Sequence, residues 1–323
     1  MVYINKVMRL YEIEQTVDEA VNYTRYIDDA ENAMKKGILT ACSIMANIKI
    51  TPEMQADIDE TRKLGSVKQA LNLAGLIKQH CANELKILAE TKMKVPVSDV
   101  VFEELGTTNG ECAYLEIRLN IAYINGITHQ IWNRWTKDLT SNNTSNPFNY
   151  TKTAKKIINT FKKTVFNSPI PALDNCASTF IHEMVHAQQH AAQAAKGISA
   201  DDTDYRSYLK TKEIPTKKAF QDMVDTENAL DDPENYKIYR ASPQEMAAFA
   251  NQDAARFIKD NKLNMPGAKA DAATMSKLQN YLGKYFRDRD NYQERTLLKR
   301  YGTLVYKAVD DYLNRKNDTK KPQ

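Results

Sequence analysis

Apolar residues recur at helical spacing over much of this chain. Over residues 66–93, for example, Ile77, Cys81, Leu85 and Leu88 fall on one stripe, which predicts a long amphipathic helix. The same spacing predicts helices at 17–27, 38–48, 152–166, 216–230 and 243–260, and two more within 272–314. A helix is also expected to begin at Asp174 or Asn175, either of which can cap it, and to run to Gly197.

The pattern changes to strict alternation between residues 115 and 123. Apolar residues there alternate with Glu116, Arg118 and Asn120, as in a half-buried strand. Asn125 and Gly126 follow, and this pair suits a two-residue hairpin turn because both turn positions favour positive φ. We therefore expect a hairpin whose second strand covers 127–135, with a third strand at 97–104.

Composition supports a mostly helical fold. The chain has 323 residues, with 42% hydrophobic and 27% charged residues, which is the balance of a globular protein. Glycine and proline number only 10 each, which argues against an all-β sandwich. We expect an α+β fold that is mostly α, with an N-terminal helical region (1–94), a central domain (95–260) and a C-terminal basic helical region (261–323).

Four features bear on where the protein works. The four cysteines are widely spaced without a Cys-x-x-Cys pair, which favours reduced thiols over a disulfide framework: Cys42, Cys81, Cys112 and Cys176. The first fifteen residues lack the apolar core of a signal peptide. No apolar run is long enough to span a membrane. The net charge is +4, but residues 256–323 alone carry 16 basic and 8 acidic side chains. We expect a cytoplasmic protein with no membrane partner. The basic residues of 256–323 are expected to form a solvated helical face, and nucleic-acid binding by this segment is the open alternative.

Candidate chemistry is concentrated in the segment FIHEMVHAQQH. Three of the five histidines lie there, at His182, His186 and His190. The segment contains the His-Glu-x-x-His pattern of zinc peptidases. Residues four apart on a helix project about 40° apart on one face and about 6 Å along the axis, so His182 and His186 can bind one zinc ion. Glu183 lies about 60° further round, where its carboxylate can bind and deprotonate a water on the zinc.

A catalytic zinc site needs a third protein ligand. His190 is too far along the helix, about 12 Å from His182, and no histidine follows it. Glu245 is the leading candidate, in the first turn of a helix that begins at Ser242 and Pro243. Its alternative role is a capping box, in which it bonds the backbone of Ser242. The other groups to consider are the upstream His80 and His129 and the carboxylates of Asp225, Glu227 and Asp253.

These residues resemble those of gluzincin-type zinc metallopeptidases. The resemblance rests on HEMVH at 182–186 and on EMAA at 245–248, and it covers roughly residues 95–260. The stretch YRASPQEMAAFA also resembles zinc peptidases encoded by bacteriophages. The resemblance implies a zincin-like core in which a small antiparallel sheet packs on the helix of residues 182–186. It implies His182, His186 and Glu245 as ligands of one Zn²⁺ and Glu183 as general base.

The resemblance also implies where a substrate would lie. An extended peptide would run along an edge strand, either 113–124 or the strand after it. A tyrosine or histidine would stabilise the oxyanion, and four residues remain open for this role: Tyr205, Tyr236, Tyr239 and His190.

The expected function is therefore a zinc metalloendopeptidase that acts on a protein or peptide substrate. A phage-encoded member would work in the host cytoplasm or the virion. Two alternatives remain open. One is a DNA-associated protease like the SprT group, although the third ligand of that group is a later histidine. The other is a catalytically inert zincin-like protein with a structural or interaction role.

Overall fold

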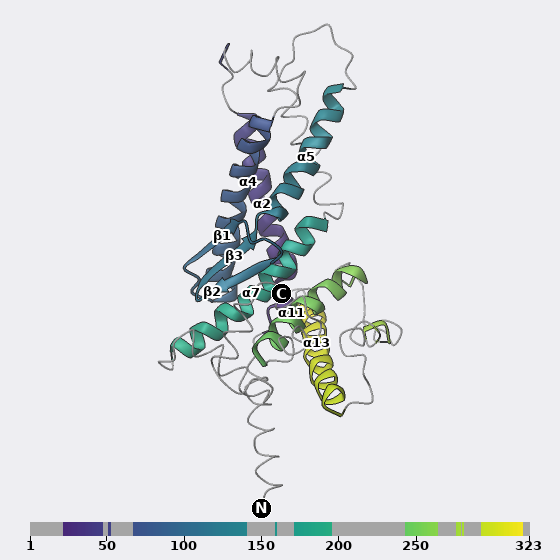
Figure 1. Ribbon diagram of the computed structural model, residues 1–323. Coiled ribbons are helices and arrows are strands. Elements are labelled where there is room, and N and C mark those ends of the chain that lie inside the picture. Colours follow the sequence, from purple (N-terminus) through teal and green to yellow (C-terminus); the bar gives the residue numbers. More distant parts are fainter. Residues whose placement is uncertain are drawn as a thin grey trace, which may run out of the picture. The chain divides into compact units, whose positions relative to one another are not determined.

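The computed structural model describes residues 22–47, 51–52, 67–140, 159, 171–195, 243–263, 276–278, 280 and 292–318 (Figure 1). Its main helices are α2 (Ile27–Ala46), α4 (Val67–Leu88), α5 (Ala122–Thr140), α7 (Pro171–Ala194), α11 (Pro243–Asp260) and α13 (Tyr292–Asp318). Two short helical turns are η1 (Thr24–Tyr26) and the π-helical η2 (Ala89–Met93), and the strands are β1 (Asp99–Glu103), β2 (Gly110–Ala113) and β3 (Glu116–Asn120). The prediction of a mostly helical α+β protein with a small sheet is confirmed. Of the helix expected at 152–166 only residue 159 is described, as helical, and the helix expected at 216–230 lies outside the described residues.

The chain divides into two compact units. One comprises Asp29–Phe180, and the other comprises Met1–Asp28 together with Ile181–Gln323. We call them the central unit and the terminal unit. The three domains expected from the sequence, at 1–94, 95–260 and 261–323, stay a prediction, because compactness alone does not establish which segments fold independently.

The sheet belongs to the central unit and has the order β1-β3-β2. β3 pairs in parallel with β1, with Val100 opposite Ile117, and antiparallel with β2. The sheet is therefore mixed, and the expectation of an antiparallel sheet was wrong. The strands predicted near 97–104 and 115–123 are present, and their alternation places Ile117 and Leu119 in the core.

The predicted hairpin at Asn125 and Gly126 was wrong. Both residues lie in α5, as does the segment 127–135 that was expected to form the second strand. The Asn120 side chain accepts a hydrogen bond from the backbone N–H of Ala122 at 2.9 Å and so caps the start of this helix. β3 lies between two partner strands, so residues 116–120 of the segment expected to align a peptide substrate do not form an edge strand, and the described part of the chain contains no strand after β3.

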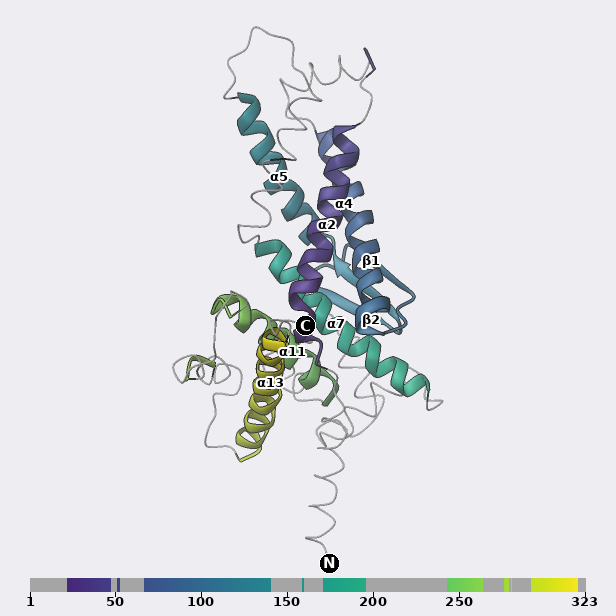
Figure 2. The same ribbon diagram turned by 180° about the vertical axis from the view of Figure 1, so that it is seen from behind.

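In the central unit, α4 and α5 contact the sheet, and α2 packs on α4. α4 packs against both β1 and α5, and α2 runs alongside α4 in both views (Figures 1 and 2). The crossing of α2 and α4 is close, since a Cβ added to Gly37 would lie 2.7 Å from the backbone nitrogen of Cys81. None of the four cysteines, all of them in the described part of the chain, forms a disulfide.

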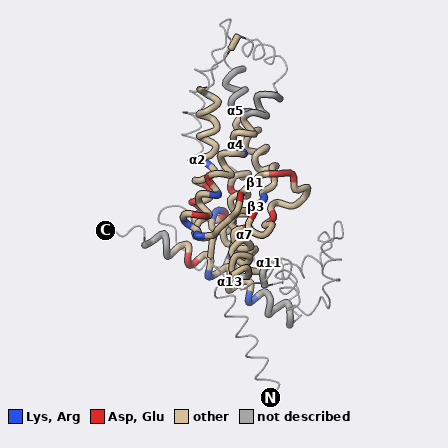
Figure 3. Tube along the Cα trace, turned by 90° about the vertical axis from the view of Figure 1, so that its left-hand side faces the viewer, with Lys and Arg blue, Asp and Glu red and all other residues tan. Residues whose placement is uncertain are grey.

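Acidic and basic residues recur along the strands and the turns that join them (Figure 3). Arg118 on β3 forms ion pairs with Glu103 at 3.3 Å and Glu111 at 2.9 Å, and it also pairs with Glu116. These groups are about a third or more exposed. Each pair is therefore screened by solvent and adds little to stability.

In the terminal unit, α11 packs against α13, and η1 contacts both helices. The Tyr301 hydroxyl on α13 donates a hydrogen bond to the buried Asp253 carboxylate on α11. Asp28 accepts a hydrogen bond from the Tyr312 hydroxyl at 2.6 Å and pairs with Lys259 at 3.0 Å. Among the described residues, no helix has both the length and the apolar character needed to cross a membrane.

Candidate metal site

The helix that carries the His-Glu-x-x-His segment begins earlier than predicted. α7 starts at Pro171, where proline suits the first helical position because its φ is already helical and no N–H partner is lost. Asp174 therefore lies within the first turn, where its charge favours the helix dipole, and it is not the cap. The helix is continuous through His182 and His186, so both side chains project from one face.

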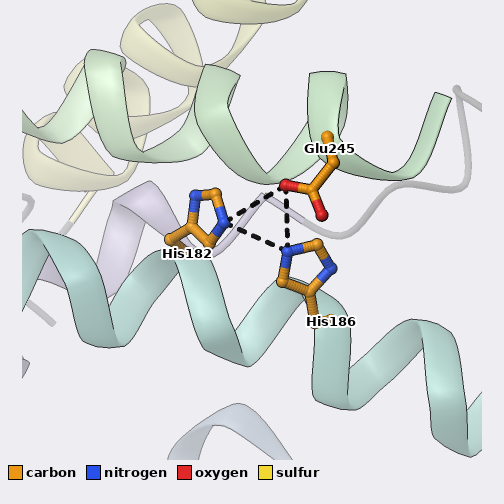
Figure 4. A group of neighbouring side chains, drawn as sticks. All are labelled: His182, His186 and Glu245. Atoms are coloured by element: carbon orange, nitrogen blue, oxygen red, sulfur yellow. Dashed lines mark hydrogen bonds and ion pairs between the residues drawn. The ribbon is translucent and has the colours of Figure 1, made fainter. Parts of the chain in front are cut away.

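The second helix of the site begins where the sequence predicts. α11 starts at Pro243, which places Glu245 in the first turn. The alternative in which Glu245 only caps its helix involves Ser242, which lies outside the described residues. What the structure gives is the position of the Glu245 carboxylate, which faces the two histidines of α7 (Figure 4).

Three potential ligand atoms converge between α7 and α11. The Nε2 atoms of His182 and His186 are 3.0 Å apart, and the Glu245 carboxylate oxygen Oε2 lies 3.6 Å from the first and 3.4 Å from the second. All three residues are buried. Among the described residues, this is the group of histidine, cysteine and carboxylate side chains that could hold a metal ion.

The dimensions of this triangle can be compared with those of a metal site. Ligands about 2.0–2.1 Å from a tetrahedral zinc ion are separated from one another by roughly 3.3–3.4 Å. The three observed separations, 3.0, 3.4 and 3.6 Å, lie on both sides of that value. Two imidazoles and a carboxylate, buried and arranged in this way, therefore fit a small divalent cation with little rearrangement.

The electrostatics of the group also favour a cation. Burial by itself would lower the pKa of the His186 imidazole, but the Glu245 carboxylate beside it, with a smaller contribution from Glu183, raises the pKa to about 9. Burial would likewise raise the pKa of the Glu245 carboxyl, but the two imidazoles hold it well below its ordinary range. The carboxylate is thus kept ionised, and without a metal its positive partner at neutral pH is the protonated His186 imidazole, whose proton a metal ion would displace.

Glu183 is buried on α7, one residue after His182. Its negative charge contributes to the raised pKa of His186, so it lies close enough to influence the group electrostatically. This location is compatible with the expected general base.

The other candidates fall into three groups. His80 and His129 belong to the central unit, on α4 and α5, and His129 is helical where a hairpin had been predicted. Asp253 accepts a hydrogen bond from Tyr301, and His190 is buried on α7. The remaining candidates lie outside the described residues: Tyr205, Asp225, Glu227, Tyr236 and Tyr239.

Sequence reasoning missed two neighbours of the ligand group. The Phe249 ring packs edge-on against the His182 ring, with centroids 4.6 Å apart. The Gln189 side-chain oxygen lies 3.1 Å from Nδ1 of His186. Helical spacing could have indicated both, because Phe249 follows Glu245 by four residues and Gln189 follows His186 by three.

Comparisons of this chain with models of known protein families, with curated proteins and with solved structures gave no match.

Proposed function

We propose that this protein is a zinc-dependent metalloendopeptidase of the gluzincin type, with His182, His186 and Glu245 as ligands of one Zn²⁺ ion. The observation that carries the proposal is the convergence of two imidazole nitrogens from α7 and a carboxylate oxygen from α11 in a buried site. The helix α7 also carries Glu183. The zincin-like core and the relation to phage-encoded enzymes are part of this proposal, and they rest on the HEMVH and EMAA segments.

The roles of the side chains follow from their chemistry. A zinc ion held by these groups would act as a Lewis acid and would make water acidic enough to ionise near neutral pH. The Glu183 carboxylate accepts a proton from the attacking water and passes it to the nitrogen of the leaving amine. Glu245 supplies one negative charge to the ligand set. Because Glu245 is buried, solvent screens this charge less than it would at the surface.

The decisive experiment separates metal binding from turnover. The full chain, Glu183→Gln and His182→Ala would be dialysed and analysed for bound metals, and each would be incubated with a peptide library read by mass spectrometry. We expect about one zinc per chain in the wild type and in Glu183→Gln, but loss of zinc in His182→Ala. Cleavage should fall by about 10²–10⁴-fold in Glu183→Gln, because general acid–base catalysis typically contributes that much.

A matched variant controls for the change from glutamate to glutamine. Glu90 is exposed in η2 of the central unit, so Glu90→Gln should cleave at the wild-type rate. If Glu183→Gln cleaves as fast as Glu90→Gln, the assigned mechanism is wrong. If the wild type binds zinc stoichiometrically but cleaves no peptide in the library, the inert zincin-like alternative is favoured.

The DNA-associated alternative requires a different measurement. Deleting residues 261–323 would remove α13, which packs on the helix carrying Glu245, and would therefore confuse DNA binding with loss of the site. Binding of the full chain to duplex DNA should instead be measured as a function of salt. A strong decrease in affinity with rising salt would support this alternative, whereas no binding at low salt would remove it.

A further inference from the structure

One ring nitrogen of His186 faces the ligand group, and the other has a partner on the same helix. Its Nδ1 atom lies 3.1 Å from the side-chain oxygen Oε1 of Gln189. An amide oxygen can only accept a hydrogen bond, so Nδ1 must carry the proton and donate it. In the neutral ring this leaves the lone pair on Nε2, the atom that lies 3.0 Å from Nε2 of His182 and 3.4 Å from the Glu245 carboxylate.

This arrangement provides what a metal-binding histidine needs. A histidine ligand usually donates its second ring N–H to a neighbouring acceptor, which fixes the tautomer and the orientation of the ring. Gln189 is only half-buried, whereas His186 is 7% exposed. The acceptor therefore lies at the edge of the buried group.

The adjacent glutamine, Gln188, has a different partner, so the contact with His186 is specific to Gln189. Gln188 is also half-buried on α7, but its side-chain oxygen accepts a hydrogen bond from the Tyr23 hydroxyl at 3.3 Å. Two consecutive glutamines thus accept hydrogen bonds from different partners, one from the N-terminal segment and one from His186.

We propose that Gln189 is a positioning residue of the metal site, which holds His186 as the Nδ1–H tautomer with Nε2 directed at the ion. The inference rests on the proposed function only in requiring that the group binds a metal ion; it does not require peptidase activity. Its measurable consequence is on metal affinity.

The test compares four forms of the full chain: wild type, Gln189→Ala, Gln188→Ala and Gln189→Glu. Zinc dissociation constants would be measured by competition with a chromophoric chelator. We expect Gln189→Ala to bind zinc about 10- to 100-fold more weakly, the usual effect of losing such a partner. Gln188→Ala, which removes the same kind of side chain one residue away, should stay within about twofold of wild type, and Gln189→Glu, which keeps an acceptor oxygen, should bind at least as tightly as wild type.

A spectroscopic readout distinguishes positioning from a general loss of structure. In zinc-loaded wild type, long-range ¹H–¹⁵N spectra should show a slowly exchanging Nδ1–H proton on His186. That proton should exchange fast in Gln189→Ala and remain slow in Gln188→Ala.

Two outcomes would overturn the inference while leaving the proposed function standing. One is a wild type that binds zinc with Gln189→Ala and Gln188→Ala indistinguishable in affinity and proton exchange. The other is Gln189→Glu binding as weakly as Gln189→Ala, since the acceptor would then be irrelevant. A wild type that binds no zinc would instead refute the proposed function itself.

Discussion

Replacing Gly37 by alanine provides a sharp test of the packing in the central unit. An ideal Cβ at this position would lie 2.7 Å from the backbone nitrogen of Cys81, 2.8 Å from its Cα and 2.8 Å from the carbonyl carbon of His80. All three atoms belong to the backbone of α4. No side-chain rotation can relieve the contacts, so α2 and α4 would have to move apart.

The size of the effect follows from these distances. Ordinary contacts begin near 3.4 Å, so the shortest contact is too close by about 0.7 Å. A gap of 0.5–1 Å removes roughly a quarter to a half of the dispersion energy of the atoms that line it. Inserting a methyl group into a packed core typically costs about 1–3 kcal/mol, which exceeds the roughly 0.5–1 kcal/mol that alanine gains over glycine inside a helix. We expect Gly37→Ala to lower the free energy of unfolding by about 1–2 kcal/mol.

The chain offers a control with the opposite sign. Gly75 is exposed on α4, and a Cβ there would meet nothing within 4 Å. Gly75→Ala should therefore raise the free energy of unfolding by about 0.5–1 kcal/mol. Both variants would be compared with wild type by urea unfolding followed by circular dichroism. A Gly37→Ala protein as stable as Gly75→Ala would show that α2 and α4 do not approach each other this closely.

Three further predictions concern pH, thiol reactivity and a buried amide. In the metal-free protein the pKa of His186 is raised from 6.5 to about 9. The interaction of the protonated ring with Glu245 therefore stabilises the folded state fully below about pH 6.5, and this contribution is lost as the pH rises through about 9. If the thermal midpoint measured in chelator does not fall over this range, the pairing with Glu245 is contradicted. Burial raises the pKa of the Cys42 thiol to about 12 and also raises the pKa of the Cys81 and Cys176 thiols. A thiol reagent at pH 8 should therefore modify Cys112 alone in the native chain and all four cysteines after denaturation. Rapid modification of a second cysteine in the native chain would be inconsistent with this burial. The Asn251 side chain accepts a hydrogen bond from the buried backbone N–H of Tyr23 at 2.8 Å, so Asn251→Ala should lower the free energy of unfolding by about 1–3 kcal/mol. The half-buried Asn261 side chain donates a hydrogen bond to the nearby backbone carbonyl of Phe257, so Asn261→Ala should change the free energy of unfolding by no more than about 0.5 kcal/mol. Equal effects of the two changes would refute the stabilising role of the Asn251 hydrogen bond.

The parts of the site that depend on local pattern were predictable from the sequence. Residues four apart on a helix must share a face, so the pairing of His182 with His186 follows once the helix is recognised. The start of α11 at Pro243 was also predictable, because proline is common at the first position of a helix. The approach of Glu245 to the histidines depends on packing between segments 59 residues apart, so the sequence indicated Glu245 as the leading candidate but left its capping role and other ligands open.

The hairpin error has a physical explanation. Asn125 and Gly126 are a strong local turn signal, but Ile124, Ile127 and Ile131 recur at helical spacing and are all buried in α5. Burial of this stripe outweighs the cost of one glycine in a helix, which is about 1 kcal/mol. The glycine also suits close packing, since a Cβ on Gly126 would lie 3.4 Å from that of Ala172 on α7. The parallel pairing of β1 with β3 could not be predicted either, because the alternation of apolar and polar residues within a strand does not show in which direction its partner runs.

The terminal unit has a consequence for the order of events during biosynthesis. The central unit is continuous in sequence, whereas the terminal unit joins residues before Asp29 to residues after Phe180. The Asn22 side chain donates a hydrogen bond to the backbone carbonyl of Ala308, and a nascent chain cannot make this contact until Ala308 has left the ribosome. Joining such distant segments is also slow, because the entropy of a long loop must be lost first. His182, His186 and Glu245 all belong to this unit, so we expect their side chains to reach their final positions late in synthesis, after the central unit has had time to fold.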